Sequence, residues 1–352
     1  MSTAIREPLP RILSGVQSSG KLHIGNYFGA IKQHIERQNH GDCFFFIADY
    51  HALTSLKEAE EKEVAAAAKN KQITPRPARQ ILADNVRDVA IDYLALGLDP
   101  AKVAFFRQSD VPEVCELAWI LSTVAGMGLL ERAHSYKDKV ANKITPNVGL
   151  FTYPILMAAD ILIYRSHLVP VGRDQEQHLE MTRDMAGSFN HAFGEVFPLP
   201  DAVFNETAIV PGTDGRKMSK SYGNTIDIFA EGKALEKTVM GIVTDKKSLE
   251  EPLDPETCNV FALYKLFASP PEIEALAAKY RAGGFGYGSA KKELLAKIDA
   301  YFAPARERRK ALERNPGLVE EALTTGAQRA RAVAQVTMRI VRERVGMHQR
   351  PV

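Results

Sequence analysis

Two short polar segments, about two hundred residues apart, hold residue types that bind phosphates. "HIGN", residues 23–26, follows the apolar run "RILSGV" and begins a predicted helix. "KMSKS", residues 217–221, places two lysines three positions apart in a glycine-flanked loop. A helix N-terminus offers backbone N–H groups and a positive dipole end to an anion. Lysines on a loop can neutralise the charge of a departing pyrophosphate.

Each segment also has an ordinary explanation. In the first, Gly25 removes a side chain that would block a phosphate, while His23 and Asn26 can donate hydrogen bonds to its oxygens. Without such a role it is a turn that carries a histidine. The second segment lacks the G-x-x-x-x-G-K-[ST] pattern of a P-loop, and without function it is a solvated linker. Taken singly, each segment leaves both explanations open.

Four continuous apolar runs predict the strands that must position these segments. Runs of this kind suit strands buried on both faces, and the helical patterns between them indicate an α/β fold with a doubly wound parallel sheet. Ligands bind such sheets at the carboxyl ends of the strands. The runs are residues 11–16, 43–50, 102–109 and 167–172.

The second half of the chain has a different pattern. From about residue 227 helical periodicity replaces the strand signals, which predicts a C-terminal all-helical domain. The last helix is expected at about 319–345, with its start marked by Pro316. Within the first half, a charged, alanine-rich excursion at about 56–80 predicts a helix and a loop. We expect a Rossmann-like catalytic domain at 1–216, a helical domain at 217–304 that begins with the "KMSKS" loop, and a C-terminal helical segment at 305–352 that packs back on the first domain.

Composition and charge limit the function classes. With 45% hydrophobic and 25% charged residues, the chain has the composition of a globular protein of about two domains. Its net charge is only +2, but from Arg306 to Arg350 eleven Lys or Arg stand against five Glu. This surplus suits either a polyanion-binding face or an exposed helix face. Three distant cysteines and the lack of a long apolar run predict a cytoplasmic protein without a membrane anchor or zinc knuckle.

"HIGN" and "KMSKS" on a parallel α/β core resemble the signature pair of the class I aminoacyl-tRNA synthetases. "GLFTYPILMAADILIY" (149–164) and "VPVGRDQEQHLEMTRD" (169–184) are similar to the pocket of the bacterial tryptophanyl-tRNA synthetases. The resemblance runs from "LSGVQSSG" to "GAQRARAV". It implies a ligase that activates L-tryptophan with ATP and transfers it to its tRNA. It further implies a homodimer, Mg²⁺ bound to the ATP phosphates with few or no protein ligands, and a helical domain that binds the anticodon.

Two positions favour tryptophan over tyrosine, the substrate of the nearest related family. An indole N–H is only a donor, so its pocket needs an acceptor, and the carboxylate of Asp160 is the strongest available. Met157 precedes it by one helical turn and stands where the tyrosyl relatives typically have glutamine. Methionine offers a polarizable apolar surface that suits an indole. Alone, Met157 would be interpreted as core filler.

The resemblance assigns roles to the other pocket positions. It implies that Tyr153 and Gln175 bind the tryptophan ammonium, that Asp174 binds ribose, that His51 lies near the indole and that Lys139 reaches the phosphates. The implied catalytic residues are His23, Asn26, Lys139, Lys217 and Lys220. The implied ATP-binding residues are Gln17, Ser19, Gly20, Gly25, Asn26, Gly172, Asp174, Lys217, Met218, Ser219 and Lys220. The implied tryptophan-binding residues are Leu13, Gly15, His51, Tyr153, Met157, Asp160, Val171 and Gln175.

The chain departs from the family pattern at a few positions. Leu13 stands where bacterial relatives often have a phenylalanine packed on the indole, His134 and Ser135 differ from the commoner pattern, and the excursion at 56–80 is longer than usual. These changes affect the pocket and not the phosphate chemistry. Two alternatives remain: a tyrosine-specific enzyme of the same fold, and a non-catalytic RNA-binding relative. Such relatives usually lose signature residues, which are intact here.

Overall fold

The structure is a computed structural model that describes residues 9–18, 20–70, 74–133, 147–204 and 210–347. Four residues singled out by the sequence, Ser19, His134, Ser135 and Lys139, lie outside these ranges, as does the side chain of Asp174. Among the described helices, none is long and apolar enough to cross a membrane.

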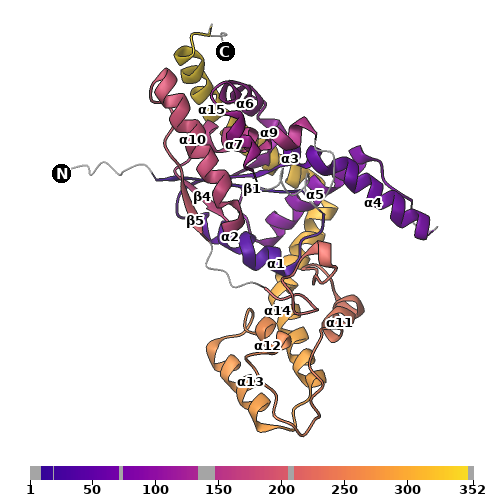
Figure 1. Ribbon diagram of the computed structural model, residues 1–352. Coiled ribbons are helices and arrows are strands. Elements are labelled where there is room, and N and C mark those ends of the chain that lie inside the picture. Colours follow the sequence, from indigo (N-terminus) through magenta and orange to yellow (C-terminus); the bar gives the residue numbers. More distant parts are fainter. Residues whose placement is uncertain (1–8, 19, 71–73, 134–146, 205–209, 348–352) are drawn as a thin grey trace, which may run out of the picture.

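A five-stranded parallel sheet forms the centre of the first domain (Figure 1). The strand order is β3-β2-β1-β4-β5, so the direction of winding reverses between β1 and β4. Ligands bind doubly wound sheets at such a reversal, outside the carboxyl ends of the strands. The predicted doubly wound fold is confirmed, although β5 was not predicted. The strands are β1 (Arg11–Val16), β2 (Asp42–Ile47), β3 (Ala104–Arg107), β4 (Leu168–Val171) and β5 (Asp201–Phe204).

Both faces of the sheet are buried, which explains why its strands are continuous apolar runs. Along β2, Phe45 belongs to the core on one face, whereas Phe44 and Phe46 belong to the core on the other. In β3, Phe105 and Phe106 divide between the two cores in the same way. Successive side chains of a strand point to opposite faces, so each core receives alternate residues.

Helices cover the two faces and form the second domain (Figure 1). The helix predicted after "HIGN" is divided, because a π-helical turn, η1, lies between α1 and α2. Around the first domain lie α1 (Ile24–Asn26), η1 (Tyr27–Ile31), α2 (Lys32–Arg37), α3 (Asp49–Ala52), η2 (Leu53–Ser55), α4 (Leu56–Lys69), α5 (Ala78–Leu96), η3 (Gln108–Asp110), α6 (Glu113–Ser122), α7 (Met127–Glu131), α9 (Val148–Ile163), η4 (Arg173–Gln175) and α10 (Glu176–Phe193). The later elements are η5 (Lys220–Tyr222), α11 (Gly232–Met240), α12 (Asn259–Tyr264), α13 (Pro270–Ala282), α14 (Tyr287–Arg314) and α15 (Pro316–Arg344).

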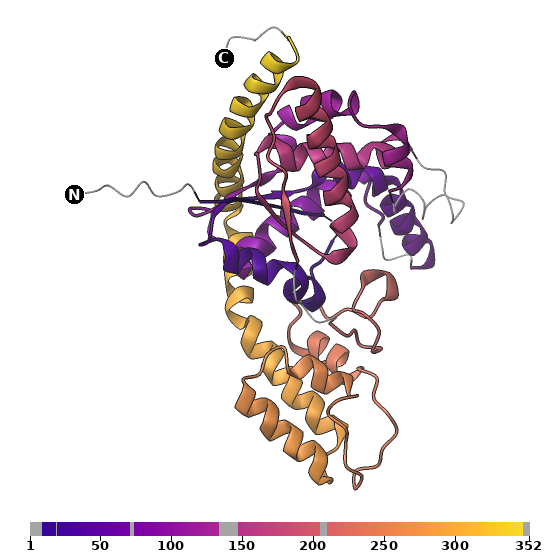
Figure 2. The ribbon, with the colours of Figure 1, turned by 60° about the vertical axis from the view of Figure 1, so that its left-hand side comes forward.

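Two long helices join the second domain to the sheet. α14 and α15 follow one another along one side of the molecule, from the helical domain to the far end of the sheet (Figure 2). The boundary expected at 304 falls inside the continuous helix α14. α15 packs on the edge strand β3, where a Cβ on Gly326 would lie 1.9 Å from the Phe105 carbonyl oxygen. Only glycine permits this close approach, and the helix covers an edge that would otherwise be open.

Basic residues of α14 and α15 hold these helices against the first domain. The residues engaged in this way are Arg308 with the Ala95 carbonyl (2.6 Å), Arg309 with Asp92 (2.7 Å), Arg329 with the Val103 carbonyl (3.0 Å), Arg331 with Glu113 (2.8 Å) and Arg342 with Glu116 (2.7 Å). Much of the basic surplus near the C-terminus therefore forms contacts within the molecule. This differs from both expectations for these residues, a polyanion-binding face and an exposed helix face.

Candidate active site

His23 and Asn26 form a reciprocal cap at the start of α1. The Asn26 backbone N–H donates to His23 Nδ1 (3.3 Å), and the His23 backbone N–H donates to Asn26 Oδ1 (3.1 Å). α1 starts shortly after the carboxyl end of β1, beside the reversal in the sheet. The "HIGN" segment is therefore a capped helix start at the position where a parallel sheet binds ligands.

The two phosphate-binding segments predicted from the sequence contact each other directly. The Gly25 N–H donates to Met218 Sδ (3.3 Å), and Lys220 Nζ donates to the Gly20 carbonyl (3.0 Å). A Cβ on Gly25 would lie 3.0 Å from His23 Nδ1 and 3.2 Å from Met218 Cβ, so a larger residue would push the segments apart. The Ile24 N–H also donates to the Ile226 carbonyl (3.0 Å).

The electrostatics of this contact keep His23 neutral. Burial, and then the charge of Lys220, lower the pKa of His23 from 6.5 to about 4, although Asp227 acts in the opposite direction. Because His23 Nδ1 accepts a hydrogen bond, we assign the single proton of the neutral ring to Nε2. Burial also lowers the pKa of Lys220. The site therefore has an imidazole N–H donor beside an ammonium group.

Asn224 organises the "KMSKS" loop from its interior. Its side chain is 2% exposed. Its Oδ1 accepts from the Ser219 N–H (2.8 Å), and its Nδ2 donates to Asp214 Oδ1 (2.6 Å) and to the Lys217 carbonyl (3.1 Å). One buried amide thus fixes the backbone on both sides of Met218. Sequence reasoning missed this residue, because a lone asparagine after a glycine is ordinary in a turn.

Asp160 lies in a buried network at the carboxyl end of the sheet. His51 Nε2 is 2.9 Å from Asp160 Oδ2. Gln108 Nε2 donates to both carboxylate oxygens, at 2.8 and 2.9 Å. Burial raises the pKa of Asp160, whereas the hydrogen bonds from His51 and Gln108 favour its charged form. Gln108, at the start of η3, was also missed, because it belongs to none of the motifs.

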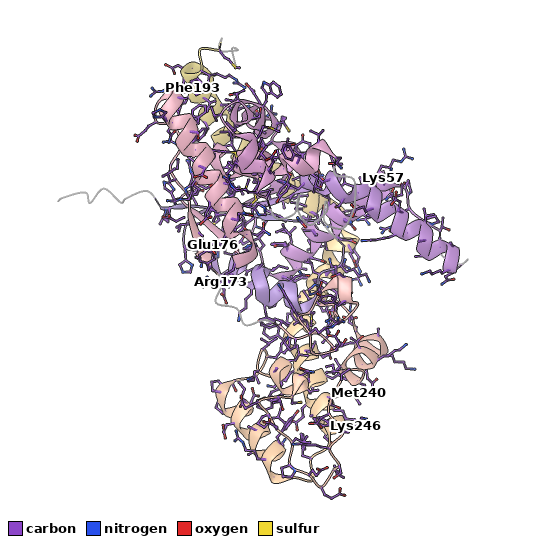
Figure 3. The ribbon with its side chains drawn as sticks, viewed as in Figure 1. Lys57, Arg173, Glu176, Phe193, Met240 and Lys246 are labelled. Atoms are coloured by element: carbon purple, nitrogen blue, oxygen red, sulfur yellow. The ribbon has the colours of Figure 1, made fainter. Side chains whose placement is uncertain are left out.

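A second chain of polar contacts joins α9 to α10. The Tyr153 hydroxyl hydrogen-bonds to His178 Nε2, and His178 Nδ1 lies 2.9 Å from Gln175 Oε1. In Figure 3, Arg173 and Glu176 are labelled where η4 and α10 begin, and Phe193 is labelled at the other end of α10. Arg173 lies over the Phe204 ring, 5.0 Å from its centroid, which connects the turn after β4 to the unpredicted strand β5.

Two cavities are lined by some of the predicted site residues, although His23, Asp160 and the "KMSKS" residues line neither. One, of about 420 Å³, is lined by Gln17, Gly20 and His51 on one side and by residues of α4 and α5, including Lys62, on the other. The second, of about 310 Å³, is lined by His51, Tyr153 and residues of α3, α6 and α9. The predicted excursion thus contributes through α4 to the wall of the first of these cavities.

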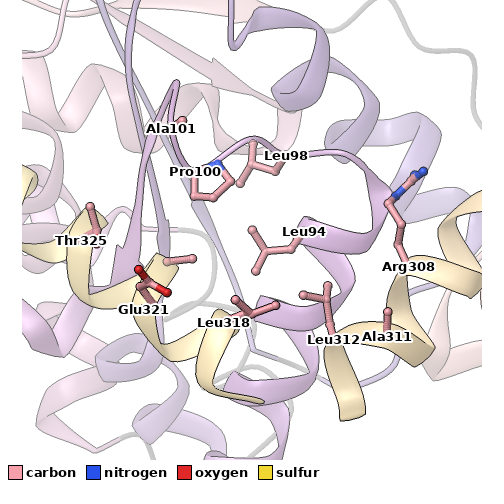
Figure 4. A pocket seen from close by; sticks show the side chains of 11 residues that line it. Leu94, Leu98, Pro100, Ala101, Arg308, Ala311, Leu312, Leu318, Glu321 and Thr325 are labelled. Atoms are coloured by element: carbon pink, nitrogen blue, oxygen red, sulfur yellow. The ribbon is translucent and has the colours of Figure 1, made fainter. Parts of the chain in front are cut away.

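A third cavity, of about 530 Å³, lies between α5, α14 and α15 (Figure 4). Its lining is mainly apolar, with Leu94, Leu98 and Leu312 pointing toward one another and Arg308 at the rim. None of the predicted site residues lines it. Size alone therefore does not identify the active site here.

The remaining predicted residues differ in exposure. Leu13 is 1% exposed within the core, and Met157 is half-buried one turn from Asp160 on α9. Gly15, Gln17, Gly172 and Lys217 are exposed, whereas Val171 and Ser219 are partly buried. The described residues contain no cluster of three or more His, Cys, Asp or Glu side chains that could hold a metal ion.

Comparison with known proteins decides the family. A family model described as "tRNA synthetases class I (W and Y)" matches residues 6–303. The tryptophan–tRNA ligase of Rhodopirellula baltica is 52% identical over 338 residues, which are 96% of this chain and 99% of that protein. The chain belongs to the tryptophan–tRNA ligase family. The ligase of Fusobacterium nucleatum is 51% identical over 96% of this chain and 98% of its own length.

A solved structure of this ligase family supports the same assignment. The tryptophanyl-tRNA synthetase of Campylobacter jejuni, crystallised with ADP and tryptophan, matches with a TM-score of 0.86 and 48% identity. The match covers 96% of this chain and 100% of that one. The predicted ligase family and enzyme class are confirmed, over both the tyrosine-specific enzyme and the non-catalytic relative.

Proposed function

We propose that this ligase attaches tryptophan to its tRNA in two steps at the site between "HIGN", "KMSKS" and Asp160. In the first step the tryptophan carboxylate attacks the α-phosphate of ATP, and pyrophosphate leaves. In the second step a ribose hydroxyl of the terminal adenosine of the tRNA attacks the carbonyl of the adenylate, and AMP leaves. The observation that carries this proposal is the direct contact of Gly25 with Met218 and of Gly20 with Lys220.

The phosphates are bound by donors from both segments. The neutral His23 offers Nε2–H, Asn26 and the start of α1 add neutral donors, and Lys217 and Lys220 oppose the triphosphate charge. ATP enters with Mg²⁺ held by its own phosphate oxygens. The ATP site also includes Gln17, Gly20, Gly25, Met218, Ser219, Gly172 and Asp174, together with Ser19 and Lys139 outside the described residues.

Tryptophan lies against Asp160, with its indole N–H directed at the carboxylate. A carboxylate has about four acceptor positions. His51 takes one and Gln108 takes two, so one acceptor position is left for the indole. Met157 and Val171 supply apolar surface, and Leu13 belongs to the buried core against which they pack. His51 and Gly15 lie beside the ring, and Tyr153 and Gln175 accept hydrogen bonds from the ammonium group.

The partners follow from the rest of the chain. The helical domain, which we delimit at 217–304, binds the anticodon, and the segment 305–352 anchors it to the catalytic domain at 1–216. The three cysteines are free, which suits a reducing cytoplasm.

The ligase forms a homodimer in this proposal. Trp119, Met127 and Val148 are 72%, 63% and 77% exposed on α6, α7 and α9, and α9 contacts both α6 and α7. We take these exposed apolar side chains as the candidate dimer surface. Light scattering of the full chain should give twice the monomer mass, and Trp119→Glu should shift it toward the monomer. A monomeric parent protein would refute the dimer.

Charging of total bacterial tRNA tests the proposed reaction. The chain should transfer labelled tryptophan, and not tyrosine, to acid-precipitable RNA when ATP and Mg²⁺ are present. Transfer of tyrosine alone, or adenylate formation without transfer, would refute the proposal.

A further inference from the structure

His178 joins two groups that the proposed function places against the tryptophan ammonium. It lies on α10, three residues after Gln175, and its side chain is buried, at 4% exposed. Its two ring nitrogens contact different partners. Nδ1 lies 2.9 Å from Gln175 Oε1, and Nε2 hydrogen-bonds to the Tyr153 hydroxyl.

The donor and acceptor roles of the two His178 ring nitrogens follow from the atoms that they contact. An amide oxygen can only accept, so His178 Nδ1 carries the hydrogen that Gln175 Oε1 receives. In a neutral ring Nε2 is then an acceptor, and the Tyr153 hydroxyl donates to it. With the hydroxyl proton directed at His178, the lone pairs of the Tyr153 oxygen point away from it.

An ammonium group has only donors. It is bound best where oxygen lone pairs converge with their own protons directed elsewhere. A Tyr153 hydroxyl free to rotate would present its proton to the ammonium for part of the time, and a Gln175 amide free to flip would present its NH₂ group. Both alternatives oppose a positive charge, and the His178 tautomer that carries its proton on Nδ1 excludes both at once.

We propose that His178 is a positioning residue that orients the oxygens of Tyr153 and Gln175 as acceptors for the α-ammonium of the amino-acid substrate. The inference rests on the proposed function, because it takes tryptophan as the substrate of this pocket. It assigns His178 a role in selecting ligands that carry a free amino group, in addition to packing α10 against α9.

Two ligands separate this role from a purely structural one. L-Tryptophan and indole-3-propionate share the indole and the carboxylate, but only tryptophan has the ammonium. We measure the dissociation constant of each on the full-length chain by calorimetry. His178→Ala should weaken tryptophan by about 10- to 100-fold, the range for loss of an oriented hydrogen bond to a charge. Indole-3-propionate should bind with nearly its original affinity.

Two conservative variants distinguish the loss of these hydrogen bonds from a general loss of folding. His178→Asn keeps a donor for Gln175, and His178→Gln keeps an acceptor for Tyr153, so each should restore part of the tryptophan affinity lost in His178→Ala. His191→Ala is the matched control, because His191 is exposed near the end of the same helix. This control should bind both ligands as the parent protein does.

The outcomes are distinguishable. Equal weakening of both ligands in all three His178 variants would show a structural role and overturn the inference, and so would unchanged tryptophan binding. Failure of the parent protein to bind tryptophan at all would overturn the proposed function together with this inference. Selective loss of tryptophan, with partial recovery in the asparagine and glutamine variants, supports it.

Discussion

Replacing Asp160 with asparagine should remove the pocket's preference for an indole N–H. In the parent protein His51 and Gln108 occupy three of about four acceptor positions on the carboxylate. The amide of the variant has a single oxygen. If this oxygen keeps the contacts with His51 and Gln108 at the Oδ2 position, the NH₂ group takes the Oδ1 position. It then loses the 2.8 Å contact with Gln108 Nε2 and meets the indole N–H as a second donor.

The expected loss follows from the hydrogen bond involved. A hydrogen bond to a charged group contributes about 1.5–3 kcal/mol. This corresponds to a tryptophan dissociation constant roughly 10- to 150-fold higher in Asp160→Asn. The affinity for ATP should change little, because the contact between Gly25 and Met218 is independent of this carboxylate.

A sulfur analogue of tryptophan provides the assay. Its benzothiophene ring matches the indole in shape but lacks the N–H. The parent protein should prefer tryptophan by about the factor given above, whereas Asp160→Asn should lose this preference. Asp49→Asn is the control, because Asp49 is also buried but accepts from the Tyr50 and Ser109 backbone N–H groups. A preference for tryptophan that survives in Asp160→Asn would refute Asp160 as the acceptor.

Three further predictions concern the phosphate side of the site. Lys220→Ala should slow adenylate formation by about 10²–10³-fold with little effect on tryptophan affinity. Lys246 is an exposed lysine of the helical domain, and Lys246→Ala should leave the rate unchanged. Equal rates in both variants would contradict the loop assignment. Asn224→Ala should raise the KM for ATP in pyrophosphate exchange by roughly 10-fold, because the amide fixes the backbone of the loop; a loss confined to tryptophan binding would argue against this. The lowered pKa of His23 makes its neutral form part of the folded state, so the stability it contributes is present above about pH 6.5 and is lost as the pH falls toward about 4. Denaturant titrations across this range should find a steeper loss in the parent protein than in His23→Gln, and parallel curves would refute the assignment.

The sequence predicted the parts of the fold that depend on local pattern. The strand at 11–16 has the predicted bounds, because an apolar run that ends in a glycine-containing turn has few alternatives. The strand β5 escaped notice because it is an edge strand of four residues, three of them only partly buried and one exposed. Likewise, the run at 43–50 combines nearly all of β2 with the start of α3, a change that apolar character does not mark.

Only those residues of the candidate site that lie in a sequence motif could be predicted. "HIGN" and "KMSKS" were located from their residue types, but that Lys220 donates to the Gly20 carbonyl is a property of the fold. Gln108 contacts Asp160, 52 positions away, and His178 contacts Tyr153, 25 positions away, so no nearby pattern indicates these partners. Asn224 hydrogen-bonds within its own loop, and its partners depend on how that loop folds. Their functions are inferred from the hydrogen bonds that their side chains form in the folded structure, and the sequence alone does not show these bonds.

Amino-acid-dependent exchange of labelled pyrophosphate into ATP tests whether this site activates tryptophan. The assay requires ATP binding, the "HIGN" and "KMSKS" contact and the amino-acid pocket to act together, and it does not depend on tRNA. With tryptophan and tyrosine tested side by side on the full chain, exchange should occur with tryptophan and remain near background with tyrosine. Exchange with tyrosine alone, or no exchange with either amino acid, would contradict the account.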